Sequence, residues 1–218
     1  MQIVFCLPGK QFSNRFLACW TNTLVYCLAN GITPIMAQAY SPNIYYVRQM
    51  CLGADVTRGK QQQPFDGKLD YDFICWLDSD SVWTPQQIQR LLNHNVDVVG
   101  ALQAHDGGGG YTCGWLSDDH FQEHGFVEYL TDESLKDHVV TNAGLLPVDY
   151  CGFGMLLVKR GVYERLEYPW HRPEWFKYED VQDFSMEDAG ACMNIKRAGF
   201  NIYVDPQVRV GHEKTAIF

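Results

Sequence analysis

The chain has 218 residues, of which 46% are hydrophobic and 20% are charged, and this composition excludes a disordered or fibrous protein. Its formal net charge of -9 and pI of about 5.1 argue against a groove for nucleic acid, so no nucleic-acid partner is expected. No apolar stretch approaches the ~20 residues that a membrane-spanning helix needs, so no transmembrane segment is expected.

The eight cysteines lie mostly within apolar runs, and none of them forms a CxxC pair. Cysteines in such positions are usually buried and reduced, and we expect that of all eight. The first nine residues lack both the basic leader and the long apolar run of a signal peptide. We therefore expect a cytoplasmic protein.

The N-terminal part of the chain alternates between strand and helix patterns. Thr84, Pro85 and Gln87 form a capping-box signal for the start of a helix. This alternation predicts an α/β fold with a central, mostly parallel twisted sheet flanked by helices. The expected elements are strands at 1–6, 33–39, 71–77 and 96–102, and helices that begin near 13, 43 and 85.

The alternation of strand and helix patterns becomes irregular after residue 103. Four consecutive glycines at 107–110 exclude regular structure there, and they predict either a flexible loop near a site or a plain surface loop. Residues 115–146 give no clear pattern. Neither a repeat nor a linker divides the chain, so a single domain is predicted. The remaining expected elements are a strand at 148–160, a short helix through Leu166, an aromatic loop at 168–176, a helix from Ser185 to Gly199 and a strand at 201–206.

Two carboxylates, Asp78 and Asp80, follow the expected strand at 71–77. In an open α/β sheet, ligands bind beyond the carboxyl ends of the strands. Neighbouring carboxylates repel each other unless a cation lies between them or they share a proton. Hard divalent cations such as Mg²⁺ and Mn²⁺ take carboxylate oxygens, so the pair is a candidate metal site. The alternative is an ordinary turn that helps to cap the next helix.

Three later features have both a functional and a structural interpretation. Glu187 and Asp188 begin a helix, where they are either site residues or charges that complement the helix dipole. Gly152 and Gly154 either let the backbone approach a ligand closely or mark a bulge. His212 follows a strand, where it is either a third ligand for Mn²⁺ or a structural histidine.

The order and spacing of these four features resemble the glycosyltransferases of the GT-A fold. That family has a DxD motif after a central strand, a glycine-containing segment, an ED motif that opens a helix and a C-terminal metal-binding histidine. The resemblance extends over residues 1–214 except for 103–146, and residues 73–102 are also similar to small stand-alone members found in bacteria and their viruses. The matching segments are Asp78-Ser79-Asp80, Cys151-Gly152-Phe153-Gly154, Met186-Glu187-Asp188 and His212.

The resemblance implies a role for each matching residue. Asp80 and His212 would ligate Mn²⁺ or Mg²⁺, and Asp78 would complete the metal site or contact the ribose or a metal-bound water. Asp188 would be the general base of an inverting transfer. Glu187 would hold the acceptor or orient Asp188.

Other residues are expected to contact the donor or the acceptor. Lys214 would neutralise the leaving diphosphate. Trp170, His171 and Trp175 would contact the acceptor, or would form an aromatic cluster. The full set expected around the donor is Pro8, Gly9, Lys10, Arg48, Asp78, Ser79, Asp80, Gly152, Gly154, Trp170 and Lys214.

The implied reaction is the transfer of a sugar from a nucleoside-diphosphate sugar, expected to be a UDP-sugar, to the hydroxyl of a glycan, lipid-linked or other acceptor. Residues 1–102 would form the nucleotide-binding half of a single domain that spans residues 1–218, and residues 103–218 would form the acceptor and catalytic half. The glycines at 107–110 would belong to a loop that closes over bound donor.

Two rival functions remain open. The run DSDSVWT fits the nucleophile motif of haloacid-dehalogenase-like phosphatases, although it lies behind two βα units and no GDxxxD motif exists. The other rival is a catalytically inactive module that binds sugar nucleotides, and the intact Asp80, Asp188 and His212 argue against it.

Overall fold

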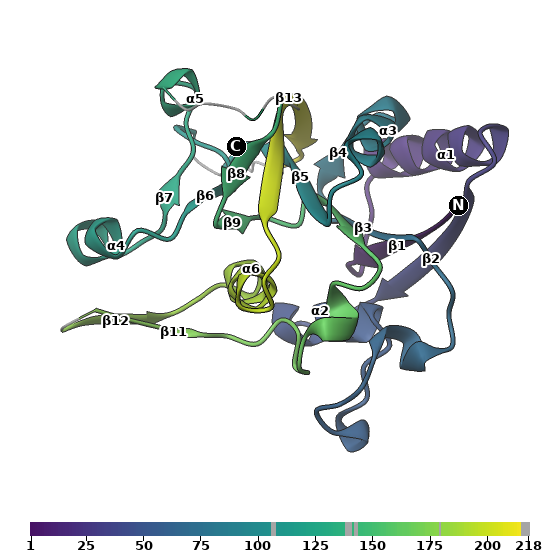
Figure 1. Cartoon of the computed structure of the whole chain (residues 1–218). Helices are drawn as coiled ribbons and strands as arrows, with labels where there is room; N and C mark the ends of the chain where they lie inside the picture. Colours follow the sequence, from purple (N-terminus) through teal and green to yellow (C-terminus); the bar gives the residue numbers. More distant parts are fainter. Residues whose placement is uncertain (106–107, 138–140, 142–143, 179, 215–218) are drawn as a thin grey trace.

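The computed structural model describes residues 1–105, 108–137, 141, 144–178 and 180–214. A mixed sheet of eight strands lies at its centre (Figure 1). The strands of this sheet are β1 (Gln2–Pro8), β2 (Thr33–Ala39), β3 (Phe73–Leu77), β4 (Ser81–Val82), β5 (Val98–Gln103), β8 (Leu146–Val148), β10 (Met155–Lys159) and β13 (Ile202–His212). Their order is β2-β1-β3-β10-β5-β13-β4, and β8 also pairs with β13.

Most strands of the central sheet point in one direction. β1, β2, β3, β5 and β13 are parallel to one another, whereas β10, β4 and β8 run antiparallel to their neighbours. β10 lies between β3 and β5 and pairs with both. The predicted α/β fold with a mostly parallel sheet is therefore confirmed.

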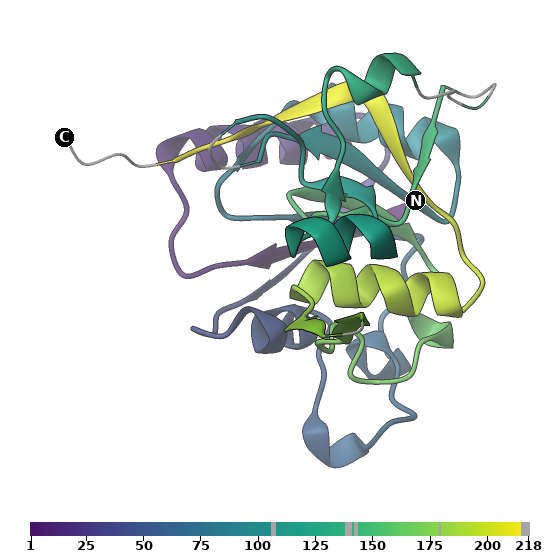
Figure 2. The same cartoon turned by 90° about the vertical axis from the view of Figure 1, so that its left-hand side faces the viewer.

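Helices cover both faces of this sheet. α1 (Asn14–Ala29) and α3 (Pro85–His94) pack on one face, and α2 (Ile44–Cys51) and α6 (Glu187–Arg197) pack on the other (Figures 1 and 2). The remaining elements are α4 (Asp118–His124), α5 (Ser134–Asp137), β6 (Cys113–Trp115), β7 (Glu128–Tyr129), β9 (Tyr150–Cys151), β11 (Trp175–Tyr178), β12 (Val181–Phe184) and 3₁₀ turns at Val56–Arg58, Pro64–Gly67 and Tyr163–Arg165.

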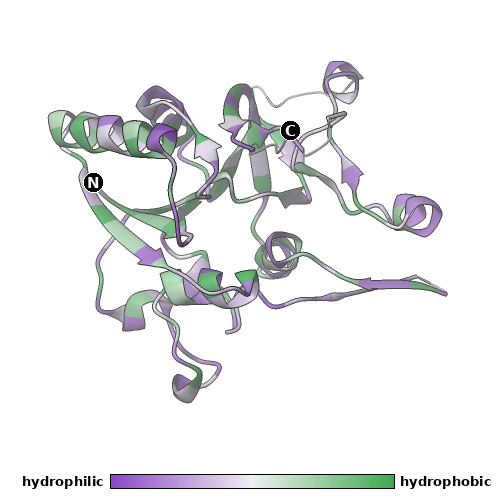
Figure 3. Ribbon diagram, turned by 180° about the vertical axis from the view of Figure 1, so that it is seen from behind, coloured by the Kyte–Doolittle hydropathy of each residue, from purple (hydrophilic) through white to green (hydrophobic). Residues whose placement is uncertain are grey.

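The two hydrophobic cores follow from the alternation of side chains along each strand. In β1, Phe5 and Leu7 face α1 and α3, whereas Val4 and Cys6 face α2 and α6. Because both faces are covered, β1 and β3 are hydrophobic along most of their length (Figure 3). This arrangement leaves the strand ends as the places where polar side chains can gather.

Several local predictions are confirmed. β2 covers the predicted residues, and α3 begins at Pro85. The backbone N–H of Thr84 donates to Gln87 Oε1 at 2.8 Å, as the capping-box signal predicted. All eight cysteines are buried and free of disulfides. In the described ranges, the helices are too short or too polar for a membrane span.

The predictions for the second half of the chain need correction. The strand expected at 148–160 is interrupted, because β9 leaves the central sheet and pairs with β6 in a separate three-stranded sheet. The helix expected to end at Leu166 is only a 3₁₀ turn. The last strand is longer than predicted, since β13 continues beyond a register shift to His212.

The helix expected from Ser185 begins two residues later. Met186 is the N-cap, and the hydroxyl of Ser185 instead accepts a hydrogen bond from the backbone N–H of Glu174 at 3.0 Å. Ser185 therefore closes the β11–β12 hairpin, which occupies part of the loop expected at 168–176. The described residues between 115 and 146 form short helices and strands whose length is too small for a clear periodic pattern.

Candidate active site

A cavity of about 300 Å³ lies at the carboxyl ends of the parallel strands. Nine of the residues expected from the sequence line it, together with four that were not expected. The expected residues are Pro8, Arg48, Asp78, Ser79, Asp80, Gly152, Glu187, Asp188 and His212. The additional residues are Ile44, Gln103, Thr112 and Phe153.

The strand directions explain why these distant residues meet. Pro8 ends β1, Asp78 follows β3 and Gln103 ends β5, and the three strands are parallel. Their carboxyl ends therefore share one edge of the sheet. Because β10 is antiparallel, the glycine segment that precedes it reaches the same edge.

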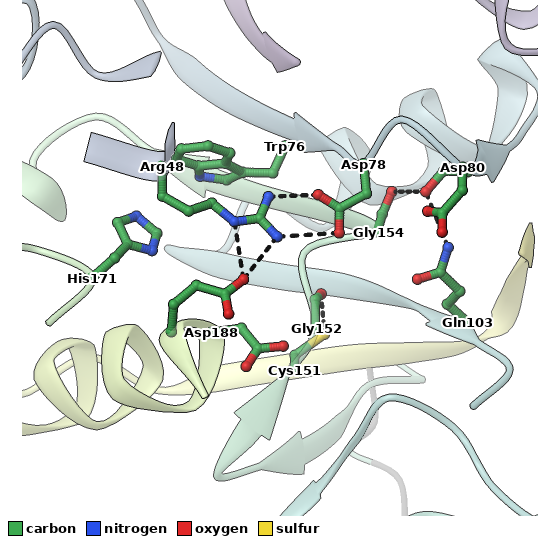
Figure 4. A network of polar contacts seen from close by, with 12 residues as sticks. Arg48, Trp76, Asp78, Asp80, Gln103, Cys151, Gly152, Gly154, His171 and Asp188 are labelled. Carbon is green, nitrogen blue, oxygen red and sulfur yellow. Dashed lines mark hydrogen bonds and ion pairs between the residues drawn. The ribbon is translucent and has the colours of Figure 1, made fainter. Parts of the chain in front are cut away.

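Arg48 links the two acidic motifs. Its guanidinium donates to both carboxylate oxygens of Asp78, at 2.5 and 3.1 Å (Figure 4). It also donates to Glu187 Oε1, at 3.2 and 3.3 Å. The same group lies 5.4 Å from the ring centroid of Trp76 and 5.0 Å from that of Phe153. Burial alone would lower the pKa of Arg48, but Asp78 and Glu187 raise it above its ordinary value.

Asp80 has two partners of its own, an imidazole and an ammonium group. Its Oδ2 lies 3.0 Å from His212 Nε2 and 2.9 Å from Lys214 Nζ. β4 pairs antiparallel with the end of β13, which brings His212 opposite Ser81. The backbone N–H of Glu213 donates to the Asp80 carbonyl at 2.7 Å and fixes this register. Each carboxylate of the DSD motif therefore has its own positively charged partner from the protein.

Two of the three expected metal ligands come together. A carboxylate and an imidazole, Asp80 and His212, suit Mn²⁺, which is commonly shared between few protein ligands and substrate phosphates. Asp78 is engaged with Arg48 instead. Within the ranges that the structure describes, no three His, Cys, Asp or Glu side chains form a group that could hold a metal ion. The residues thus fit a two-ligand site, and the metal roles of Asp78, Asp80 and His212 all stay predictions.

Asp188 lies at the start of α6 and is partly buried. It accepts hydrogen bonds from the backbone N–H of Ala189 at 2.7 Å and from the Tyr150 hydroxyl at 3.3 Å. Burial raises the pKa of Asp188, and the nearby carboxylate of Glu187 raises it further, to about 7. A carboxylate with a pKa near neutrality can both take up and release a proton at physiological pH.

Other expected donor contacts lie beside the cavity. Gly9 packs so closely on Ser79 that a Cβ at Gly9 would come within 2.8 Å of the Ser79 Cβ. A Cβ on Gly154 would lie 2.0 Å from Gln103 Oε1, so any other residue here would displace the Gln103 amide. Lys10 is exposed, with its Nζ 5.5 Å from the ring centroid of Tyr40.

The expected contact of Trp170 with the donor or acceptor is wrong. Trp170 and His171 are fully buried and lie outside this cavity. The rings of Tyr163 and Tyr168 pack against Trp170, so it belongs to the alternative that the sequence left open, an aromatic cluster in the core. Trp175 is exposed on β11.

Several residues that complete the site were not predicted from the sequence. Gln103 ends β5, so the rule that ligands bind at the carboxyl ends of strands could have found it. Thr112 lies in the irregular stretch after residue 103 and Tyr150 in the strand expected at 148–160, and no sequence signal marks either of them as a site residue. Part of the glycine loop, residues 106 and 107, lies outside the described residues, so closure over a donor stays a prediction.

Arg48→Met should lower the free energy of unfolding by about 3 kcal/mol, because Asp78 and Glu187 would lose their shared cation in a mostly buried setting. Urea denaturation measures this change. Arg15→Met is the matched control, since the Arg15 side chain is 70% exposed and lies 3.9 Å from Glu213; its effect should stay within about 0.5 kcal/mol. Equal effects of the two changes would contradict the structural role of Arg48.

Asp188→Asn should stabilise the protein at alkaline pH. Because the pKa of Asp188 is raised to about 7 on folding, its contribution to stability is lost as the pH rises from about 4 to about 7. The variant avoids this loss, so at pH 8 it should be more stable than the wild type by roughly 1 to 3 kcal/mol, and at pH 4 the difference should vanish. Thermal unfolding of both proteins across this range measures the difference; a gap that does not change with pH would contradict the raised pKa.

Comparisons with known proteins give a fold but no family. The structure of "A197 from STIV" matches with a TM-score of 0.56 and 17% sequence identity, covering 99% of this chain and 87% of that chain. A glycosyltransferase "involved in the glycosylation of the major capsid of PBCV-1" matches with a TM-score of 0.38 and 12% identity, covering 97% and 81%. The first match shows a shared fold, whereas the TM-score of the second match is too low to support a conclusion. No family model and no curated protein matches the sequence.

Proposed function

We propose that this chain is a metal-dependent glycosyltransferase that moves a sugar from a nucleoside-diphosphate sugar to an acceptor hydroxyl with inversion. The observation that carries the proposal is the convergence of the DSD turn, the glycine segment, the ED helix start and His212 on one cavity. These segments are far apart in the chain, and each has an ordinary structural explanation when taken alone. In the proposal, residues 1–102 supply the nucleotide-binding half and residues 103–218 the acceptor half of one domain.

The donor would lie against the DSD turn. Asp80 and His212 would hold Mn²⁺ or Mg²⁺, which when bound supplies positive charge to the diphosphate of the donor. Lys214 already contacts Asp80 and could turn to the leaving diphosphate. Asp78 would accept from the ribose hydroxyls or from water, while Arg48 keeps its carboxylate in place.

Asp188 would take the proton of the acceptor hydroxyl. As that O–H bond breaks, the oxygen forms a bond to the anomeric carbon of the sugar, and the bond from that carbon to the diphosphate breaks. Glu187 is a weaker candidate for the base because Arg48 holds its carboxylate. The hydrogen bonds from Ala189 and Tyr150 orient Asp188 for this step.

The pH dependence of the transfer rate should follow the protonation of Asp188. Because its pKa is about 7, kcat/KM should fall about tenfold for each pH unit below 6 as the carboxylate takes up a proton. Initial rates between pH 5 and 9 measure the profile, and a UDP-sugar is the first donor to test. A rate that is independent of pH over this range would remove Asp188 as the base.

Binding of UDP tests the donor site without turnover. Isothermal titration calorimetry with UDP should show saturable binding in the presence of Mn²⁺ and much weaker binding in EDTA. Tight binding of UDP in both conditions would favour a nucleotide site without metal, and absence of binding in both would contradict the donor site.

A further inference from the structure

The solvent-facing side of α1 carries no charge along most of its length. Residues 16–47, which include most of α1 and all of β2, contain no Asp, Glu, Lys, Arg or His, although 20% of the chain is charged. A helix on the surface of a protein usually presents charged and polar side chains to the solvent. On α1, the large apolar side chains Leu17, Val25 and Leu28 are 62%, 63% and 70% exposed instead. An exposed apolar face of this kind indicates an interaction surface.

Four residues form a second stripe along α1, which we call the outer seam. They follow the i, i+4, i+7, i+11 spacing of a coiled-coil seam and are Leu17, Thr21, Leu24 and Leu28. The buried residues of the helix are different ones, namely Phe16, Cys19, Thr23 and Cys27. The Thr21 hydroxyl donates to the Leu17 carbonyl at 2.8 Å, so this hydroxyl keeps its partner when the outer seam is covered.

The outer seam faces the open edge of the central sheet. Tyr26 marks the side of α1 that faces α3, because its hydroxyl donates to Gln89 Oε1 at 3.4 Å. On a helix with 3.6 residues per turn, the outer seam lies on the opposite side. There α1 packs on β2, the edge strand (Figure 1). Met36 of β2 adds an exposed apolar side chain on the same face of the sheet, since Ile35 and Ala37 face the other core.

The free edge of β2 is a poorer docking element than α1. The backbone N–H of Thr33 donates to the Met1 carbonyl at 2.9 Å, so the odd-numbered residues of β2 hydrogen-bond toward β1. The even-numbered residues therefore direct their backbone groups outward, and one of them is Pro34, which has no N–H. A proline on an edge strand hinders the addition of a further strand. The heptad spacing of the outer seam points to a helix as the partner instead.

The charge of the chain indicates which helix fits. Each chain carries a net charge of -9, so two copies repel each other least where uncharged surfaces meet. The outer seam also complements itself. With a two-fold axis between residues 22 and 23, an antiparallel pair of α1 helices places Leu17 opposite Leu28 of a second copy. A membrane surface fits less well, because helices that lie on membranes are rich in Lys and Arg, and α1 has only Arg15.

We propose that the outer seam is the interface of a two-fold dimer, in which α1 packs antiparallel on α1 of a second copy. The 16 residues of α1 span about 24 Å, so the seam is small beside the ~800 Å² that each partner buries in a stable complex. The dimer should therefore be reversible, with a dissociation constant in the micromolar range. No residue of α1 lines the candidate active site, so the pairing leaves that cavity open.

Sedimentation equilibrium at protein concentrations between about 5 and 300 µM tests this proposal without donor, metal or acceptor. The mass of the wild type should rise from 25.0 kDa toward twice that value as the concentration increases. Leu28→Glu should raise the dissociation constant at least about tenfold, because it places a carboxylate from each copy in an apolar interface. The fold should be retained because Leu28 is exposed, and circular dichroism checks this.

Val56→Glu is the matched control, since Val56 is 72% exposed, lies outside the uncharged stretch and gains the same charge. Its dissociation constant should equal that of the wild type. A wild type that stays at 25.0 kDa over the whole range overturns the proposal, as does a dimer that Leu28→Glu weakens no more than Val56→Glu. If the wild type stays monomeric but floats with vesicles of phosphatidylcholine and phosphatidylserine, and Leu28→Glu does not, the outer seam binds a membrane surface in place of a second copy.

Discussion

Asp188→Asn should lower the rate of sugar transfer about 10²- to 10⁴-fold, the usual loss when a general base is removed. The substitution keeps the size of the side chain and an oxygen that can accept from the backbone N–H of Ala189. Donor affinity should therefore change little, and the loss should appear in kcat. Steady-state rates with a fixed acceptor and varied donor separate kcat from KM.

Asp183→Asn is the control for this change, because Asp183 is an exposed acid on β12 and does not line the cavity. Its transfer rate should match that of the wild type. Had Asp188 only complemented the helix dipole, its loss would cost about 0.3 to 1 kcal/mol of stability and little rate. If Asp188→Asn transfers sugar within about threefold of the wild type, Glu187 becomes the next candidate, and a retaining mechanism gains support.

Asp80→Ala should remove metal and donor binding together and reduce turnover by at least about 10³-fold, because charge stabilisation by a metal contributes several kcal/mol. Its carboxylate contacts His212 and Lys214 at the edge of the sheet and is only partly buried. The fold should therefore survive, which circular dichroism can verify. Chelation by EDTA should have the same effect on the wild type, and Mn²⁺ should reverse it.

Asp70→Ala is the matched control for Asp80→Ala, since Asp70 is a highly exposed acid that precedes β3, at the opposite end of the strand from the DSD turn. It should bind UDP and Mn²⁺ like the wild type. Full activity of the wild type in EDTA would contradict the metal site. The contacts of Asp80 with His212 and Lys214 would then be purely structural.

Much of the fold could be predicted because local patterns decide it. Residues 1–102 alternate between strands with continuous apolar runs and helices with capping signals, and the structure follows this order. The second half is less predictable, since its strands are short and leave the central sheet. The sequence 148–160 has the apolar character of one strand, but the chain turns at Gly152–Gly154 and divides it between two sheets.

The contacts within the site could not be predicted from local sequence. Arg48 lies 30 residues from Asp78 and 139 from Glu187, and only the packing of α2 and α6 on the same face of the sheet brings them together. From the sequence, a divalent cation between Asp78 and Asp80, or a shared proton, is expected to offset their repulsion. In the structure, each of these carboxylates also contacts a cationic side chain of the protein. The spacing of residues in the sequence does not predict these contacts.

The most direct test of the transferase is the release of nucleoside diphosphate from a panel of donor sugars in the presence of Mn²⁺. At least one donor, with UDP-sugars first, should be hydrolysed slowly without acceptor, and EDTA or Asp80→Ala should abolish the release. Release of phosphate from simple phosphate esters, with no nucleoside diphosphate from any donor, would contradict a transferase and favour a phosphatase.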